Sequence, residues 1–150
     1  MTPLTRISIL SVITILGCGR AVWAQVPSHS CSDASLRGEY AFNASGFNIL
    51  NGVALPKAVV EFVRFNGDGT LTVLAATRSV NGVVTRSPLS GVGTYTVAAD
   101  CTGSVVFGPP GPTFDLFLGP DSLRGRMIQT TDPTPGALPV MQGILEKIAR

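Results

Sequence analysis

Turn-forming segments interrupt this sequence at regular intervals, and they constrain its fold more than any other feature. They lie at residues 66–69 (NGDG), 81–82 (NG), 100–103 (DCTG) and 119–121 (GPD). Asn-Gly and similar pairs supply the positive φ values that tight hairpin turns need. The segments between them are short and rich in Val, Thr, Phe and Tyr, which favour strands. With 17 glycines and 11 prolines and no long run at helical period, the chain is predicted to be all-β.

The spacing predicts nine strands, preceded by one helical turn at residues 32–36 that Ser32 or Asp33 would cap. Short antiparallel strands joined by tight turns favour a small barrel of about eight strands in a meander, because closure removes unpaired edges. A two-sheet β-sandwich is the alternative. The expected strands cover residues 39–44, 57–65, 70–79, 83–87, 92–98, 104–107, 113–118, 123–130 and 140–148.

The first 24 residues have the features of an export signal. Arg6 precedes an uninterrupted run of apolar and small residues at 7–17, which is shorter than the about 20 residues that cross a bilayer. Residues 22–24 (VWA) predict cleavage before Gln25, giving a periplasmic or secreted protein. Alternatively, residues 15–18 (ILGC) resemble a bacterial lipobox, and a lipidated Cys18 would anchor the protein to the envelope membrane.

These features divide the chain into a signal peptide at residues 1–24, a leader with a short helical turn at 25–37, and a single barrel domain at 38–150. Removal of the signal also removes Arg6 and Arg20, so nine of the 11 basic residues remain against nine acidic ones. A neutral chain without a basic tract is not expected to bind nucleic acid. Contact with a membrane is expected only if Cys18 is lipidated.

Two cysteines remain after processing. Cys31 and Cys101 form an even pair in a compartment that oxidises thiols, which predicts a disulfide. The large loop that this bond would close stabilises the folded chain by about 4 kcal/mol in the chain-entropy model.

No catalytic, metal or cofactor site is predicted. His29 is the only histidine and lies in the polar leader, so Ser-His-Asp and Cys-His mechanisms lack their base. One histidine and two cysteines that are expected to be bonded also leave no zinc site of ordinary composition. Residues 67–69 (GDG) lack the lysine and helix of a phosphate-binding loop.

Charged residues within strands are the remaining candidates for a binding site. Glu61 and Arg64 come first, because residues 58–65 are apolar on both faces, as in a strand covered on both sides. These side chains would line the barrel interior, or they would pair with other charged residues on the outer surface, where charged residues usually lie. The same two alternatives hold for Arg78, Asp115, Arg124 and Arg126.

The interior itself has two possible states. Two proline-stiffened loops, at residues 108–112 and 131–139, would either flank a barrel mouth or be rigid connectors. A barrel of eight strands is just wide enough for packed side chains or one small ligand. The residues that would fill a solid core are Phe42, Phe62, Phe65, Phe114, Phe117 and Met127.

Several segments together resemble a group of small exported bacterial proteins without an assigned function, whose barrel is similar to that of allene oxide cyclase-like proteins and to the lipocalin barrel. The segments are residues 31–32 (CS), 36–42 (LRGEYAF), 65–69 (FNGDG), 93–97 (GTYTV), 100–104 (DCTGS) and 131–133 (TDP). The resemblance implies a barrel able to hold something apolar. No catalytic residue of the cyclases can be placed on this sequence, and a fold alone does not determine function.

We therefore expect an exported, non-catalytic β-barrel that binds a small apolar ligand or serves as an envelope component. The alternative is an enzyme of cyclase or isomerase type that acts on a hydrophobic substrate inside the barrel. The sequence carries no signal for an oligomeric state.

Overall fold

A computed structural model describes residues 30–87, 91–108 and 110–148. The expected signal peptide, its cleavage site, Cys18 and His29 lie outside these residues. No helix among the described residues is long and apolar enough to cross a membrane. The elements, in chain order, are η1 (Asp33–Ser35), β1 (Arg37–Leu50), β2 (Val53–Asn66), β3 (Thr70–Val80), β4 (Val83–Ser87), β5 (Gly91–Val97), β6 (Thr102–Phe107), β7 (Thr113–Leu118), β8 (Arg124–Thr131) and β9 (Leu138–Lys147).

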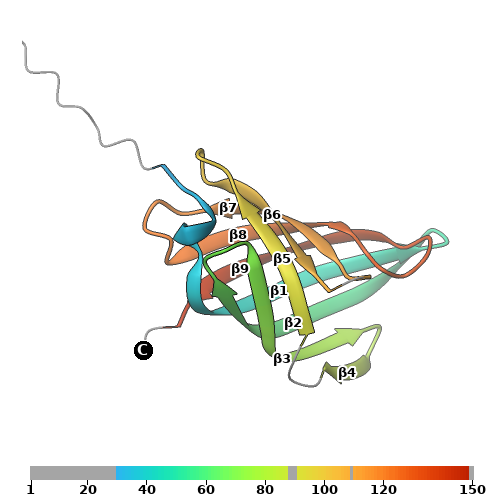
Figure 1. Cartoon of the computed structure of the whole chain (residues 1–150). Helices are drawn as coiled ribbons and strands as arrows, with labels where there is room; N and C mark the ends of the chain where they lie inside the picture. Colours follow the sequence, from blue (N-terminus) through green and yellow to red (C-terminus); the bar gives the residue numbers. More distant parts are fainter. Residues whose placement is uncertain (1–29, 88–90, 109, 149–150) are drawn as a thin grey trace, which may run out of the picture.

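The strands form a closed antiparallel barrel (Figure 1). The hydrogen-bonded order is β2-β1-β9-β8-β7-β6-β5-β3-β4, and a further pairing of β2 with β3 joins the two sides. Eight strands thus close on themselves, while β4 adds to the free half of β3. The predicted small barrel is confirmed, and closure rules out the sandwich alternative.

Side chains alternate between the barrel interior and the solvent, as the pleat of a strand requires. In β7, Phe114, Leu116 and Leu118 are buried and the residues between them are exposed. The prediction that residues 58–65 are covered on both sides is wrong: Val60 is 52% exposed and Phe62 is 46% exposed on the outer face of β2. No other described element packs over this face, so its apolar side chains remain in water.

The first hairpin is longer than predicted. Its strands reach Leu50 and restart at Val53, joined by an Asn51-Gly52 turn with φ values of 51° and 80°. This pair has the positive φ values typical of a tight hairpin, but the preceding segment 45–50 (SGFNIL) lacks clear alternation. The tip of the hairpin projects beyond the barrel body together with the start of β9, with Ile49 paired to Leu138 (Figure 1).

The end of the barrel at which β1 starts is closed by the segment that precedes it. The predicted helical turn is confirmed as η1, with Ser32 as its N-cap. Leu36 is fully buried, and the predicted disulfide ties Cys31 to Cys101 in the β5–β6 turn. We refer to this half as the closed end and to the opposite half as the open end.

The open end is shaped by a bulge in β3. The register between β2 and β3 shifts at Phe62/Val63, where Leu74 is the extra residue on β3. Because the side-chain period of a strand is two, one inserted residue switches which side chains face inward. Leu71 and Val73 point inward before the bulge, whereas Ala76 and Arg78 do so after it.

Candidate functional site

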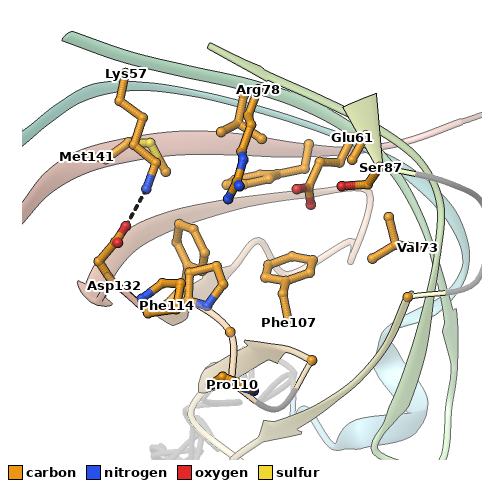
Figure 2. A pocket seen from close by; sticks show the side chains of 18 of the residues that line it. Lys57, Glu61, Val73, Arg78, Ser87, Phe107, Pro110, Phe114, Asp132 and Met141 are labelled. Atoms are coloured by element: carbon orange, nitrogen blue, oxygen red, sulfur yellow. Dashed lines mark hydrogen bonds and ion pairs between the residues drawn. The ribbon is translucent and has the colours of Figure 1, made fainter. Parts of the chain in front are cut away.

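A cavity of about 340 Å³ occupies the open end. Its apolar walls are supplied by Phe42, Val59, Val73, Phe107, Phe114 and Met141, and its charged lining by Lys57, Glu61, Arg78 and Asp132 (Figure 2). Both proline-stiffened loops reach it, through Pro110 and Pro112 on one side and Pro133 on the other. These loops therefore flank a mouth, as one of the two sequence interpretations expected.

Three phenylalanines form the apolar floor of the cavity. Phe42 and Phe114 meet edge to face at 5.3 Å between ring centroids, and Phe107 and Phe114 do so at 5.5 Å. Such pairs stabilise beyond the area that they bury. The rings block the barrel below the cavity, so the solid-core alternative holds for the closed end and not for the open end.

Glu61 projects from β2 into the cavity (Figure 2). Its Oε2 atom is buried and has no hydrogen-bond partner among the described residues. Burial raises the pKa of this carboxyl to about 7, and the positive charges of Arg78 and Lys57 offset only part of that effect. A carboxyl with such a pKa can both donate and accept a proton near neutral pH.

Arg78 enters the same cavity from β3. In the register of the two strands, Arg78 lies opposite Val59 and Ala76 lies opposite Glu61, so Arg78 and Glu61 are diagonal neighbours on one wall. The Arg78 side chain forms no hydrogen bond or ion pair with any described residue. The residue is exposed at the mouth, so the donors of its planar guanidinium are open to water and to a ligand.

Lys57 and Asp132 form the other charged pair of the cavity. The Lys57 Nζ atom donates to Asp132 Oδ2 at 2.7 Å, and both side chains are buried, at 7% and 4% exposed. Lys57 also donates to Gln129 Oε1 at 3.0 Å and to Asn48 Oδ1 at 3.4 Å. A buried ion pair is tolerated when additional hydrogen bonds satisfy its remaining atoms, as they do here.

The Asp132 carboxylate is held by more than its lysine. Asn48 Nδ2 and Gln129 Nε2 both donate to Oδ2 at 3.1 Å, and the Thr134 amide donates to Oδ1 at 2.9 Å. Burial alone would raise the pKa of Asp132, but these donors and the Lys57 ammonium hold it well below its usual range. The network fixes the β8–β9 loop against the hairpin of β1 and β2, so this side of the mouth has a defined shape.

The structure separates the residues that the sequence singled out. Glu61 and Arg78 line the cavity, whereas Arg64 lies on the outer wall and pairs with Glu39 at 2.6 Å. Arg124 pairs with Glu146, also on the outside, and Asp115 and Arg126 are exposed as well. Of the proposed core side chains, Phe62 and Phe117 are exposed at 46% and 55%, because they lie on the outward faces of β2 and β7.

Sequence reasoning missed Lys57, Asp132, Asn48 and Gln129. One signal was present: Lys57, Val59, Glu61, Val63 and Phe65 share one face of β2, and the buried Phe65 shows that this face is internal. The Asp132 contact with Lys57 joins residues 75 positions apart and leaves no local signal.

The arrangement can bind an apolar molecule and present one acid and one cation to it. Among the described residues no group of His, Cys, Asp and Glu could hold a metal ion. The disulfide and the aromatic cluster of Tyr40, Phe65 and Tyr95 lie at the closed end, away from the lining of the cavity.

Comparison with known proteins adds no assignment. No protein-family model, curated protein or solved structure matches the chain. The small eight-stranded barrel is thus established from the structure itself, and the resemblance to allene oxide cyclase-like proteins finds no support beyond that general architecture.

Proposed function

We propose that this protein is an exported barrel that binds one small, mainly apolar molecule in the cavity at its open end. The observation that supports this most is the cavity itself: about 340 Å³, walled by phenylalanine, valine and methionine, and reached between two loops. This volume lies within the usual range of ligand pockets, roughly 300–1,000 Å³. A mainly apolar wall with a few polar groups is also typical of such pockets.

The state of Glu61 supports a binding site over an unfilled packing defect. A buried carboxyl oxygen without a partner costs free energy, about 1–3 kcal/mol for a polar group, and such groups in native structures call for an explanation. Among the described residues, Glu61 Oε2 is the buried side-chain oxygen that lacks a hydrogen-bond partner. A ligand with a polar group would satisfy it.

Binding is tested with 1-aminoanthracene, an uncharged dye whose fluorescence rises in apolar cavities. The exported protein should bind the dye, and Val59→Phe should weaken binding at least tenfold by filling the cavity. Val60→Phe is the matched control, because Val60 is the next residue and is 52% exposed on the outer face. Circular dichroism and thermal melting would show that both variants fold.

Ala76→Leu is a second, milder variant that fills the cavity from β3. Dye binding that is absent in the wild-type protein, or unchanged in both Val59→Phe and Ala76→Leu, would refute the ligand-binding proposal. The role of an envelope component would then be the one left to pursue.

Export is part of the proposal, and the disulfide is compatible with it. An intact mass of the product recovered outside the cytoplasm distinguishes a chain that starts at Gln25 from one acylated at Cys18. A product that retains residues 1–24, or one that has free thiols at Cys31 and Cys101, would contradict export.

The position of Glu61 also supports a second function, proton transfer on a bound substrate as in isomerases. A carboxyl with a pKa of about 7 inside an apolar cavity is suited to general acid–base chemistry. The test follows deuterium exchange at the carbons beside the carbonyl of 2-octanone in D2O. Exchange should rise as the pH passes 7 and be lost in Glu61→Gln; exchange that is equal in Glu61→Gln and in wild type would exclude this function.

A further inference from the structure

Two of the four charged side chains that line the cavity are paired with each other and two are not, and this selects the class of ligand. The inference rests on the proposed function, since it concerns which molecules the cavity would hold. Lys57 is neutralised by Asp132 at 2.7 Å. Glu61 and Arg78 remain, and neither side chain forms a hydrogen bond or ion pair with a described residue.

These two groups share one wall without joining each other. Glu61 lies opposite Ala76, and Arg78 is two residues further along β3, so Glu61 and Arg78 are diagonal neighbours. Diagonal neighbours on antiparallel strands are separated by roughly 7–8 Å. Figure 2 shows both side chains directed into the cavity from the strands above it. Because no described residue pairs with either group, a ligand group that accepts hydrogen bonds can lie beside both.

We propose that the cavity selects small apolar monocarboxylates, with the carboxylate bound between Arg78 and Glu61. The hydrocarbon part then lies against Phe42, Phe107 and Phe114. A cavity of about 340 Å³ equals roughly eleven water volumes, which suits a molecule of about ten non-hydrogen atoms. Octanoate has this size and this charge.

A carboxylate satisfies both unpaired groups, whereas other headgroups do not. The guanidinium of Arg78 can donate two parallel hydrogen bonds to it, and the protonated Glu61 can donate a third. An alcohol would leave the positive charge of Arg78 without a counterion. An ammonium group would be repelled by the like charge of Arg78. The Asp132 carboxylate is already engaged by Lys57, and Glu61 would pair with an ammonium only in its ionised form.

Binding of an anion beside Glu61 makes affinity depend on pH. The charged groups that face Glu61 are Arg78 from β3 and Lys57 from β2 with its partner Asp132. The lining residues that the structure describes on β1, β4, β6, β7 and β9 carry no charge. Loss of the Glu61 proton therefore places a second negative charge next to the ligand and weakens its binding.

The experiment compares three molecules of equal chain length, octanoate, 1-octanol and octylammonium, as competitors of 1-aminoanthracene at pH 6 on the exported protein. Octanoate should bind at least tenfold more tightly than octanol, and octylammonium most weakly. Arg78→Gln should weaken octanoate roughly 10- to 100-fold, since it removes a charged hydrogen-bond partner, and should leave octanol unchanged. Arg126→Gln, on the exposed outer wall, is the matched control.

A second comparison uses Glu61→Gln, which keeps a hydrogen-bond donor but cannot ionise. Between pH 6 and pH 8.5 the affinity for octanoate should fall in the wild-type protein and stay level in this variant. Octanol should be insensitive to pH in both proteins.

Equal affinities for octanoate and octanol, or an Arg78→Gln variant that binds octanoate as well as wild type does, would overturn the inference. In either case a dye that still binds leaves the proposed function standing. Failure of the wild-type protein to bind the dye or any of the three competitors would instead refute the proposed function itself.

Discussion

The two ends of this barrel are built from the same alternating strands, yet they satisfy their polar groups in opposite ways. At the closed end the Tyr95 hydroxyl accepts from the Gly67 amide and lies 2.9 Å from the carbonyl oxygens of Asp33 and Leu36. At the open end, among the residues that the structure describes, Glu61 Oε2 is buried without a partner and Arg78 forms no hydrogen bond or ion pair.

This difference shows where the fold is stabilised and where it is available for binding. The closed end combines a disulfide, a plug segment (residues 31–36, with η1 and the buried Leu36) and three aromatic rings in edge-to-face contact, Tyr40, Phe65 and Tyr95. The open end leaves a cavity, and a saturated network around Lys57 and Asp132 holds the loop at the mouth. Sites that bind ligands commonly carry groups that are left unsatisfied in the free protein.

The largest effect is expected from breaking the disulfide at the closed end. Replacement of both Cys31 and Cys101 by serine should lower the free energy of unfolding by about 4 kcal/mol, because the unfolded chain regains the freedom of a long loop. Urea denaturation measures this. Binding of 1-aminoanthracene at low temperature should be unchanged, and a loss of dye binding in the folded variant would show that the two ends are not independent.

Removal of the anion at the mouth is expected to have the next largest effect. Asp132→Asn leaves the Lys57 ammonium buried without a counterion, which should cost about 3 kcal/mol. The control is Glu146→Gln, which breaks the exposed pair with Arg124 and should cost less than about 1 kcal/mol. Thermal and urea unfolding measure the stability of both variants. An equal loss of stability in Asp132→Asn and in Glu146→Gln would contradict a structural role for the buried pair.

Stability should also depend on pH through Glu61. Burial raises the pKa of Glu61 from 4.5 to about 7, so the folded chain binds this proton more tightly than the unfolded chain does. Its stabilising contribution is complete below about pH 4.5 and is lost as the pH rises through 7. We expect a loss of about 2 kcal/mol, from 1.36 kcal/mol per pKa unit reduced for partial solvent contact.

Urea denaturation at pH 4.5, 6 and 7.5 measures this dependence. Glu61→Gln should abolish the decline over this range, whereas Glu146→Gln, at an exposed position, should retain it. A wild-type protein whose stability does not change between pH 4.5 and 7.5 would show that Glu61 ionises normally.

The smallest effect is expected at the closed end, from Tyr95→Phe. The variant keeps the ring that packs on Phe65 at 5.0 Å and removes only the hydroxyl. The groups that it bonded, at Leu36 and Gly67, lose a partner, which should cost about 1 kcal/mol. A loss above about 3 kcal/mol in urea denaturation would mean that the plug segment depends on this one hydroxyl.

Much of the fold was predictable because its signals are local. The turn pairs at residues 66–69 and 81–82 set the hairpins, and the alternate apolar residues 114, 116 and 118 form the buried face of β7. The prediction failed for β2, where Val60 and Phe62 are apolar but face water. Composition alone cannot tell a strand buried on both sides from one with an apolar outer face.

The candidate site was predictable only in part, for a related reason. Glu61 stood out as a charge in an apolar strand, and Arg64 was grouped with it because the two are close in sequence. Three residues along a strand reverse the side chain, so Arg64 points outward to Glu39. Arg78 takes its place in the cavity because the bulge at Leu74 shifts the phase of β3.

The sequence by itself determined the class of fold, the pairing of Cys31 with Cys101 and the order of the hairpins, since each depends on residue types at short range or on a simple count. Only the tertiary structure decided which charges face the cavity and which are neutralised there. Closure of the barrel brings Asp132 to Lys57 and leaves Glu61 Oε2 without a partner among the described residues. Burial and ionic pairing depend on the register between strands, and a register that one bulge can shift is not encoded in any single segment.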